Sequence, residues 1–222
     1  MTQILEVKMH NNLKLVIFDM DGVLVDACDW HKIALNEALK EVSGYEIPLE
    51  DHYKKYNGLP TKVKLNMLIK EGHVQEKDLE SIYEAKQLKT VDIIKRESVV
   101  KEEKIELMEW LRDSQINVAC FTNSIRMTAQ LMLERAGVYG YLDLLVTNQD
   151  VSSPKPNPEG YIKTIKHFNC SPKDAIIVED SPKGLEAAEK SGANILKVKN
   201  ATFVTTNTVK RYIDENFNSN GR

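Results

Sequence analysis

The chain has 222 residues, of which 42% are hydrophobic and 28% are charged, and its formal net charge is −3. This length suits one core domain with a sizeable insertion, or two small domains, and the composition is that of a protein with an ordinary buried core. Charges of both signs are interspersed, which argues against a nucleic-acid-binding face. No apolar run approaches the roughly 18 residues that a membrane helix needs.

The N-terminal segment and the cysteines indicate the cellular compartment of the protein. Residues 1–6 contain no basic region followed by a long apolar stretch, so we expect no signal peptide. The cysteines at positions 28, 120 and 170 are far apart and lack CxxC spacing, which gives neither a disulfide framework nor a zinc site. We therefore expect a cytoplasmic protein, a monomer or weak dimer, whose partner is a small molecule and not nucleic acid or a membrane.

The first predicted element is a buried strand over residues 13–18, a short apolar run. The stretch of residues 29–97 contains no convincing strand and instead shows helical patterns punctuated by glycine, proline and asparagine. We therefore expect an all-helical insertion after the first strand. Its predicted helices cover residues 30–42, 49–56, 61–71 and 76–94.

Strands and helices alternate in the rest of the chain. This alternation predicts an α/β fold, a doubly wound parallel sheet with helices on both faces. Apolar runs predict strands at residues 116–121, 142–146, 175–178 and 193–198. Helical patterns lie at residues 125–136, 159–168 and 185–190.

Two carboxylates, Asp19 and Asp21, come directly after the first predicted strand. In a doubly wound sheet the crevice beyond the carboxyl ends of the strands is where ligands bind. Gly22 then allows the backbone to turn away sharply. Taken alone, this short pattern is also typical of loop acids that cap the next helix.

Hydrogen-bond donors and a lysine follow later strands. Thr122 and Asn123 come after the run at residues 116–121, and their side chains can donate hydrogen bonds to a phosphoryl oxygen. Lys155 stands between two prolines, which hold the loop extended and aim a compact positive charge in one direction. Taken alone, Thr122 is more typical of a helix N-cap and the lysine loop is typical of a solvated turn.

The acidic pair Glu179 and Asp180 follows the strand predicted at residues 175–178. Hard cations such as Mg²⁺ take oxygen ligands, commonly one or two carboxylates together with a substrate phosphate. Ser181 and Pro182 are typical of a helix start, which leaves the two acids unexplained. Because all four motifs lie at carboxyl ends of predicted strands, we expect them to meet in one crevice and to form a catalytic site.

The order Asp-x-Asp, Thr, Lys, Glu-Asp resembles that of the haloacid dehalogenase (HAD) superfamily, over residues 13–198. The stretches 19–26, 153–160 and 178–188 are similar to its β-phosphoglucomutase-like and phosphatase branch. That branch carries a helical C1 cap inserted after the first motif, in agreement with the helical insertion expected above.

The resemblance implies a Rossmann-like core domain of residues 1–28 and 98–222 and a helical cap domain of residues 29–97. It also implies a Mg²⁺-dependent phosphatase that hydrolyses a small phosphorylated metabolite, by analogy a sugar phosphate, through an aspartyl-phosphate intermediate. The cap closes over the crevice, so a macromolecule could not enter.

The resemblance further implies roles for the motif residues. Asp19 attacks phosphorus, and Asp21 protonates the leaving oxygen and then takes a proton from water. Thr122 and Lys155 stabilise the phosphoryl oxygens. The implied metal ligands are the Asp19 carboxylate, the Asp21 backbone carbonyl, Glu179 and Asp180.

Other residues are candidates for substrate binding. Each cap candidate also has a plainer interpretation, since Thr61 at a helix start is typical of an N-cap and His31 beside a tryptophan is typical of a packed histidine. We expect Asn123 to help place phosphate or water. The substrate-binding candidates are Gly22, Asn123, His31, Asn57, Thr61 and Lys64.

Three alternatives stay open. A sugar-phosphate mutase of the β-phosphoglucomutase type grips a second phosphate with Lys and Arg in the cap loop, where this chain has Asn57 and Thr61, and carries a threonine where this chain has Ala27. Lys62 or Lys64 could substitute for those cations. A dehalogenase needs neither the second acid nor the metal ligands. A non-catalytic HAD-fold binding protein usually lacks a catalytic residue, and none is missing here.

Overall fold

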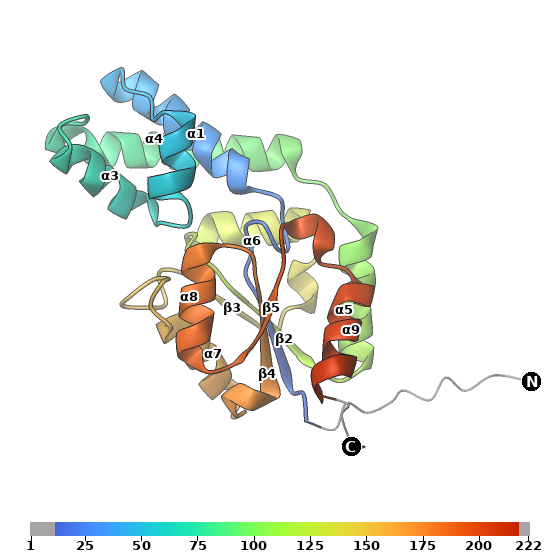
Figure 1. The fold of residues 1–222 in the computed structure, drawn as a ribbon. Coiled ribbons are helices and arrows are strands. Elements are labelled where there is room, and N and C mark those ends of the chain that lie inside the picture. The colour runs from blue at the N-terminus through green and yellow to red at the C-terminus, as the bar shows by residue number, and fades with distance from the viewer. Residues whose placement is uncertain (1–11, 218–222) are drawn as a thin grey trace, which may run out of the picture.

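The structure, a computed structural model, describes residues 12–217, so the segment on which the signal-peptide expectation rests lies outside it. The described chain forms a parallel five-stranded sheet in the order β3-β2-β1-β4-β5 (Figure 1). The predicted strands and the doubly wound α/β fold are confirmed, with small shifts at the strand ends. The strands are β1 (Leu15–Phe18), β2 (Asn117–Phe121), β3 (Leu144–Val146), β4 (Ala175–Glu179) and β5 (Asn194–Lys197).

The central strand β1 is apolar throughout because both of its faces are covered. Its side chains alternate between two hydrophobic clusters, with Val16 and Phe18 in one and Leu15 and Ile17 in the other. A strand buried on both faces needs no polar positions, which explains the continuous apolar run in the sequence.

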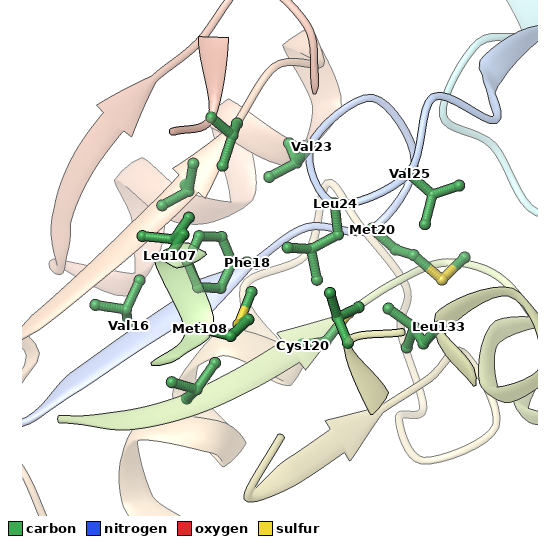
Figure 2. Close-up of a cluster of buried hydrophobic side chains, with 14 of the residues drawn as sticks. Val16, Phe18, Met20, Val23, Leu24, Val25, Leu107, Met108, Cys120 and Leu133 are labelled. Atoms are coloured by element: carbon green, nitrogen blue, oxygen red, sulfur yellow. The ribbon is translucent and has the colours of Figure 1, made fainter. Parts of the chain in front are cut away.

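Helices cover each face of the sheet. Helices α7 (Glu159–His167) and α8 (Pro182–Ser191) pack on the face of Leu15 and Ile17. The other face carries α5, α6 and α9, and Figure 2 shows Phe18 of β1 close to Leu107 and Met108 of α5. Those three helices are α5 (Glu102–Asp113), α6 (Arg126–Arg135) and α9 (Thr206–Phe217).

The sequence analysis did not assign α5 and α9. Helix α5 begins with acidic residues and buries Leu107, Met108 and Leu111, and α9 buries Val209 and Ile213. In both helices apolar residues on one stripe are outnumbered by charged and polar ones. The apolar stripe of α5 is weak, whereas that of α9 is as pronounced as that of the predicted helix α7, so the sequence did carry the signal for α9.

Residues 29–97 form helices and turns without a strand, as predicted, and they carry a hydrophobic cluster of their own. That cluster joins Leu39, Tyr56, Leu65 and Ile82 from different helices. The predicted helix at residues 49–56 is a short α-helix followed by one π-helical turn, His52–Tyr56. The helices are α1 (Cys28–Ser43), α2 (Leu49–Asp51), α3 (Thr61–Lys70) and α4 (Leu79–Glu97).

In Figure 1 the helices α1, α3 and α4 lie together above the sheet and the helices that cover it. The segments before α1 and after α4 connect them to the rest of the chain. Helix α4 packs against α1 and also against α6 of the sheet layers, and its Ile94 belongs to the cluster of Figure 2. Short 3₁₀ turns complete the connections, at Glu76–Asp78, Tyr139–Tyr141, Pro172–Asp174 and Ala201–Phe203. In the part of the chain that is described, no helix combines the length and the hydropathy of a bilayer span.

Candidate active site

The carboxyl ends of the central strands bring the motif residues together. Asp19 follows β1, Thr122 follows β2 and Asp180 follows β4, while Lys155 comes from the loop between β3 and α7. All four side chains line one cavity of about 400 Å³. The opposite wall of the cavity comes from α1, α3, α4 and the loop before α3, and includes His31, Asn57, Gly58, Thr61, Lys64 and Lys86.

Lys155 is the centre of a buried charge cluster. Its Nζ lies 2.5 Å from Asp19 Oδ1 and 2.6 Å from Glu179 Oε1, and the residue is only 4% exposed. Burial alone would lower the pKa of Lys155, but the two carboxylates outweigh it and raise the pKa well above its usual value. Burial and the neighbouring Glu179 raise the pKa of Asp19, and Lys155 works against that shift. The ammonium therefore stays charged and holds two carboxylates in place.

Glu179 is fully buried, and both of its carboxylate oxygens accept hydrogen bonds from the protein. Oε1 accepts from the Tyr161 hydroxyl at 2.8 Å as well as from Lys155. Oε2 accepts from the backbone N–H groups of Asp180 and Ser181 and from the Ser181 hydroxyl. Gly184 leaves room for this carboxylate, because a Cβ at that position would overlap it.

The acids include a cluster that fits a hard cation. One carboxylate oxygen from each of Asp19, Glu179 and Asp180 lies within 4.8 Å of the others. Asp180 Oδ1 is buried and, within residues 12–217, has no hydrogen-bond partner. Burial and the charge of Glu179 raise the pKa of Asp180 to about 6. An orphaned buried carboxylate oxygen beside two other carboxylates is the donor set that Mg²⁺ or a similar ion takes.

Gly22 lies behind this cluster and does not line the cavity. Its φ of 90° is a left-handed backbone conformation, and a Cβ would overlap the Asp180 carboxylate. The sequence analysis placed Gly22 among the substrate-binding candidates. The structure gives it the role of letting the β1 loop and Asp180 approach each other closely.

The Asp21 carboxylate contacts two residues outside the acid cluster, His31 and Ser124. His31 Nε2 lies 3.1 Å from Asp21 Oδ1, and the Ser124 hydroxyl donates to Oδ2 at 3.2 Å. The other ring nitrogen, Nδ1, lies 3.2 Å from Lys86 Nζ. An ammonium only donates hydrogen bonds, so His31 Nδ1 accepts one from Lys86. The ring proton is therefore on Nε2, which donates a hydrogen bond to the Asp21 carboxylate.

These contacts set the charge states of the Asp21 chain. Burial alone would raise the pKa of Asp21, but His31 and Lys86 outweigh it and lower the pKa below its usual value. Burial and then Lys86 lower the pKa of His31, which keeps the ring neutral. Burial and then Lys64 lower the pKa of Lys86 to about 7.

Asn123 connects the two walls of the cavity. Its Nδ2 donates to Gly58 O at 2.9 Å and to Lys155 O at 3.2 Å, and its Oδ1 accepts from Lys155 N at 3.0 Å. Lys183 Nζ donates to the neighbouring carbonyl, Asn57 O, at 2.7 Å. Asn57 therefore meets the core through its backbone, and the amide of Asn123 is occupied by protein groups.

The lysines of α3 differ from each other. Lys62 Nζ pairs with Glu80 at 3.4 Å and lies over the Tyr83 ring, whereas Lys64 lines the cavity with no hydrogen bond or ion pair to its ammonium within the described residues. Burial and then the charge of Lys183 lower the pKa of Lys64 to about 8. Thr61 is the first residue of α3 and makes no N-cap hydrogen bond, so the N-cap interpretation of Thr61 is wrong.

Several residues of this site are not apparent from the sequence motifs. Tyr161 and Ser181 hold Glu179, and Ser124 and Lys86 hold the chain from Asp21 to His31. One signal for Lys86 was available. It occupies an inward position on α4, four residues after the buried Ile82, where an unpaired lysine needs an explanation.

The fold and the carboxylate–lysine cluster together define an α/β enzyme whose site lies at the switch point of a doubly wound sheet. The chain belongs to the family described as haloacid dehalogenase-like hydrolase, whose sequence model matches residues 16–198. The predicted superfamily is thereby confirmed.

Relatives that are named as phosphatases agree with the family. The chain is 29% identical over 186 residues to a phosphorylated carbohydrates phosphatase from Thermotoga maritima, covering 81% of this chain and 82% of the relative. It is 25% identical over 180 residues to a phosphoglycolate phosphatase from Aquifex aeolicus, covering 81% and 82% respectively. The predicted enzyme class, a HAD-type phosphoric monoester hydrolase, is confirmed.

A solved structure supports the fold. The β-phosphoglucomutase from Clostridium difficile superposes with a TM-score of 0.79 and 22% sequence identity, covering 93% of this chain and 97% of that one. At that identity the likeness concerns the fold, and the choice between phosphatase and mutase has to come from the site.

Proposed function

We propose that this protein is a Mg²⁺-dependent phosphatase that hydrolyses a small phosphorylated carbohydrate through an aspartyl-phosphate intermediate. The observation that carries the proposal is the position of Asp19, buried at the end of β1, bound to Lys155 and clustered with Glu179 and Asp180. The name of the Thermotoga maritima relative, a phosphorylated carbohydrates phosphatase, supports the substrate class.

In this proposal the carboxylates of Asp19, Glu179 and Asp180 and the backbone carbonyl of Asp21 hold the metal ion. Bound Mg²⁺ would supply positive charge that offsets the repulsion between an anionic nucleophile and an anionic phosphate. Lys155 adds to that charge from the protein side, since its ammonium already contacts Asp19 at 2.5 Å.

The reaction then proceeds in two displacements at phosphorus. An Asp19 oxygen bonds to phosphorus while the bond to the ester oxygen breaks, and Asp21 gives its proton to that oxygen. A water molecule next attacks phosphorus, loses its proton to Asp21 and releases phosphate from Asp19. Thr122, buried at the end of β2, donates its hydroxyl hydrogen to a phosphoryl oxygen in both steps.

The acid role of Asp21 requires a change of its protonation state. In the free protein the pKa of Asp21 is lowered, so the carboxylate is ionised at neutral pH. An arriving phosphate dianion raises that pKa, because like charges oppose ionisation. The ionised form suits the second displacement, in which Asp21 acts as the base towards water.

We further propose that residues 29–97 act as a cap domain over this site. Asn123 and Lys183 donate hydrogen bonds to the consecutive carbonyls of Gly58 and Asn57, which holds the loop before α3 against the core. The cavity of about 400 Å³ has room for a small metabolite, and the cap over it limits the access of bulk water during the first displacement.

Phosphate release from a panel of phosphorylated metabolites tests the proposal, with Mg²⁺ or with EDTA. We expect turnover by the wild type with Mg²⁺, none with EDTA, and none by Asp19→Asn. Asp113→Asn at the exposed end of α5 is the matched control and keeps wild-type turnover. Full activity of Asp19→Asn would refute the mechanism, and turnover that needs an added sugar bisphosphate would favour the mutase.

A further inference from the structure

The helices α1 and α2 border a second hollow, of about 610 Å³, which we call the α1–α2 groove. Its lining includes Ile33, Glu37 and Lys40 of α1, Glu46 of the following loop and Leu49 of α2. Ile33 is 41% exposed and Leu49 is 60% exposed. Two large apolar side chains that are exposed at one groove are a feature of interaction surfaces.

The exposed face of α1 carries charges without partners. Ile33, Glu37 and Lys40 are exposed and follow the i, i+4, i+7 spacing of one helix face. Glu37 and Lys40 could pair with each other at i,i+3 spacing, but they form no ion pair. The next acid on the helix, Glu41, is bound to Lys89 at 2.8 Å. Among residues 12–217, Glu37 and Lys40 therefore lack an ion-pair partner.

The charge pattern of this face selects its occupant. An acid and a base one turn apart become complementary to themselves when a two-fold axis passes between them. Two antiparallel α1 helices then bring Glu37 of each copy opposite Lys40 of the other copy, so both ion pairs form twice. A partner of a single charge sign would leave one of the two residues unpaired. The face therefore fits a second copy of this chain.

The same register also provides space for the apolar side chain of α1. Ile33, four residues before Glu37, comes opposite Gly44, four residues after Lys40. Gly44 ends α1 with a left-handed φ of 72°, and a Cβ at this position would meet nothing within 4 Å. The open space lets Ile33 of the second copy reach the end of α1 while the helix axes approach to about 8–10 Å.

We infer that the α1–α2 groove is the interface of a two-fold symmetric homodimer, in which the α1 helices pack antiparallel and Glu37 of each copy binds Lys40 of the other. The inference concerns assembly and goes beyond the proposed function. All residues that line the groove lie within residues 32–52, so the sheet and its helices stay outside the interface. Lys32 and His52 line both the groove and the catalytic cavity, so the interface lies directly behind the helical wall of that cavity.

Sedimentation velocity over a wide range of protein concentration tests the inference. We expect the wild type to shift from monomer to dimer as concentration rises. Glu37→Lys and Lys40→Glu each place like charges opposite each other at two points, so each should weaken association at least about tenfold. The matched controls are Glu84→Lys on α4 and Lys70→Glu, an exposed lysine at the end of α3. Both positions lie outside the groove, and both variants should associate like the wild type.

An equimolar mixture of Glu37→Lys and Lys40→Glu tests the register. In the mixed dimer both contacts again join an acid and a base, so the mixture should form dimers at a concentration at which each variant alone is monomeric. The double variant, with both substitutions in one chain, restores the same pairs and should associate like the wild type. No contact at another face of the molecule predicts this pattern of loss and recovery.

Ile33→Ser and Leu49→Ser test the apolar part of the interface. Each should weaken association by roughly tenfold, since each removes a large apolar side chain that the dimer buries. Circular dichroism of each variant checks that the chain is folded, which the exposure of all four substituted positions favours. A wild type that stays monomeric at every concentration would overturn the inference and leave the groove to a different partner. So would a dimer that the charge reversals leave intact, or a mixture that stays monomeric.

Discussion

The two walls of the cavity treat charge in opposite ways. On the wall formed by the sheet, Lys155 lies between Asp19 and Glu179, and Glu179 accepts hydrogen bonds at both of its oxygens. On the helical wall, Lys64 has no carboxylate partner among the described residues, and Lys86 contacts only the neutral ring of His31. The lysine of the sheet wall is paired within the protein, whereas Lys64 of the helical wall has no such pair among residues 12–217.

This difference predicts opposite responses to the loss of a lysine. Breaking a buried ion pair leaves charges without a partner, which is strongly destabilising. Removing a lysine that has no counter-ion removes a desolvation penalty and can stabilise the folded protein at the expense of function.

Lys155→Met is expected to lower the free energy of unfolding by about 3–5 kcal/mol, because Asp19 and Glu179 then lose their shared ammonium. Phosphate release is expected to fall at least 100-fold, on the order of one lost transition-state contact. Urea unfolding followed by circular dichroism measures the first effect. Lys70→Met is the control, and a Lys155→Met protein as stable as that control would show that the cluster is not a tight network.

Gly184→Ala is expected to weaken metal activation, since a Cβ would overlap the Glu179 carboxylate and displace it. Overpacking of this kind costs about 1–3 kcal/mol of stability. Titration of activity with Mg²⁺ should give a half-activating concentration at least about tenfold higher, as for other disturbed metal ligands. Gly140→Ala, where a Cβ meets nothing within 4 Å, should leave both quantities unchanged.

Lys64→Met is expected to stabilise the free protein at pH 7 by about 1–2 kcal/mol, in contrast to Lys155→Met. The sign follows from the pKa of Lys64, which burial and Lys183 lower to about 8 from the usual 10.5. The unfolded chain holds the proton more tightly, so the wild type gains stability as pH rises from about 8 to about 10.5. The urea midpoints of Lys64→Met and the wild type are measured at pH 7 and at pH 10. The difference between the two proteins should be smaller at pH 10 than at pH 7.

Lys86→Met is expected to have the smallest effect, a change in the pH dependence of kcat. Lys86 helps His31 to lower the pKa of Asp21, so its removal raises that pKa. The acidic limb of the pH profile should move upward by less than about one pH unit, the scale of one indirect charge. An unshifted limb with a uniformly lower rate would assign Lys86 a purely structural role.

Much of this architecture could be predicted because the relevant residues are close to buried strands in the sequence. Asp19, Thr122 and Asp180 each follow an apolar run, and the parallel sheet brings the ends of these runs to one edge. The contact between Lys86 and His31 joins positions 55 residues apart on two helices, so no local pattern reveals it. The packing of α4 against α1 decides it.

The choice between Lys62 and Lys64 shows the same limit on a smaller scale. Two residues along an α-helix differ by roughly 200° in direction, so the two lysines leave α3 on nearly opposite sides. Both lysines line the cavity, and neither sequence position nor charge says which of them pairs with a carboxylate, as Lys62 does with Glu80. The orientation of α3 is set by Leu65 and Leu68, which are buried in the cluster shared with Leu39 and Tyr56.

The hydrogen bonds that Asn123 and Lys183 make to the loop before α3 have a consequence for the timing of turnover. When the cavity opens, the carbonyls of Gly58 and Asn57 accept hydrogen bonds from water in place of those from Asn123 and Lys183. At a net contribution of about 1 kcal/mol per hydrogen bond, the two bonds bias the closed form by only about 2 kcal/mol. A closed form favoured by these two bonds alone would leave an open population on the order of a few per cent, enough for a metabolite to enter by conformational selection.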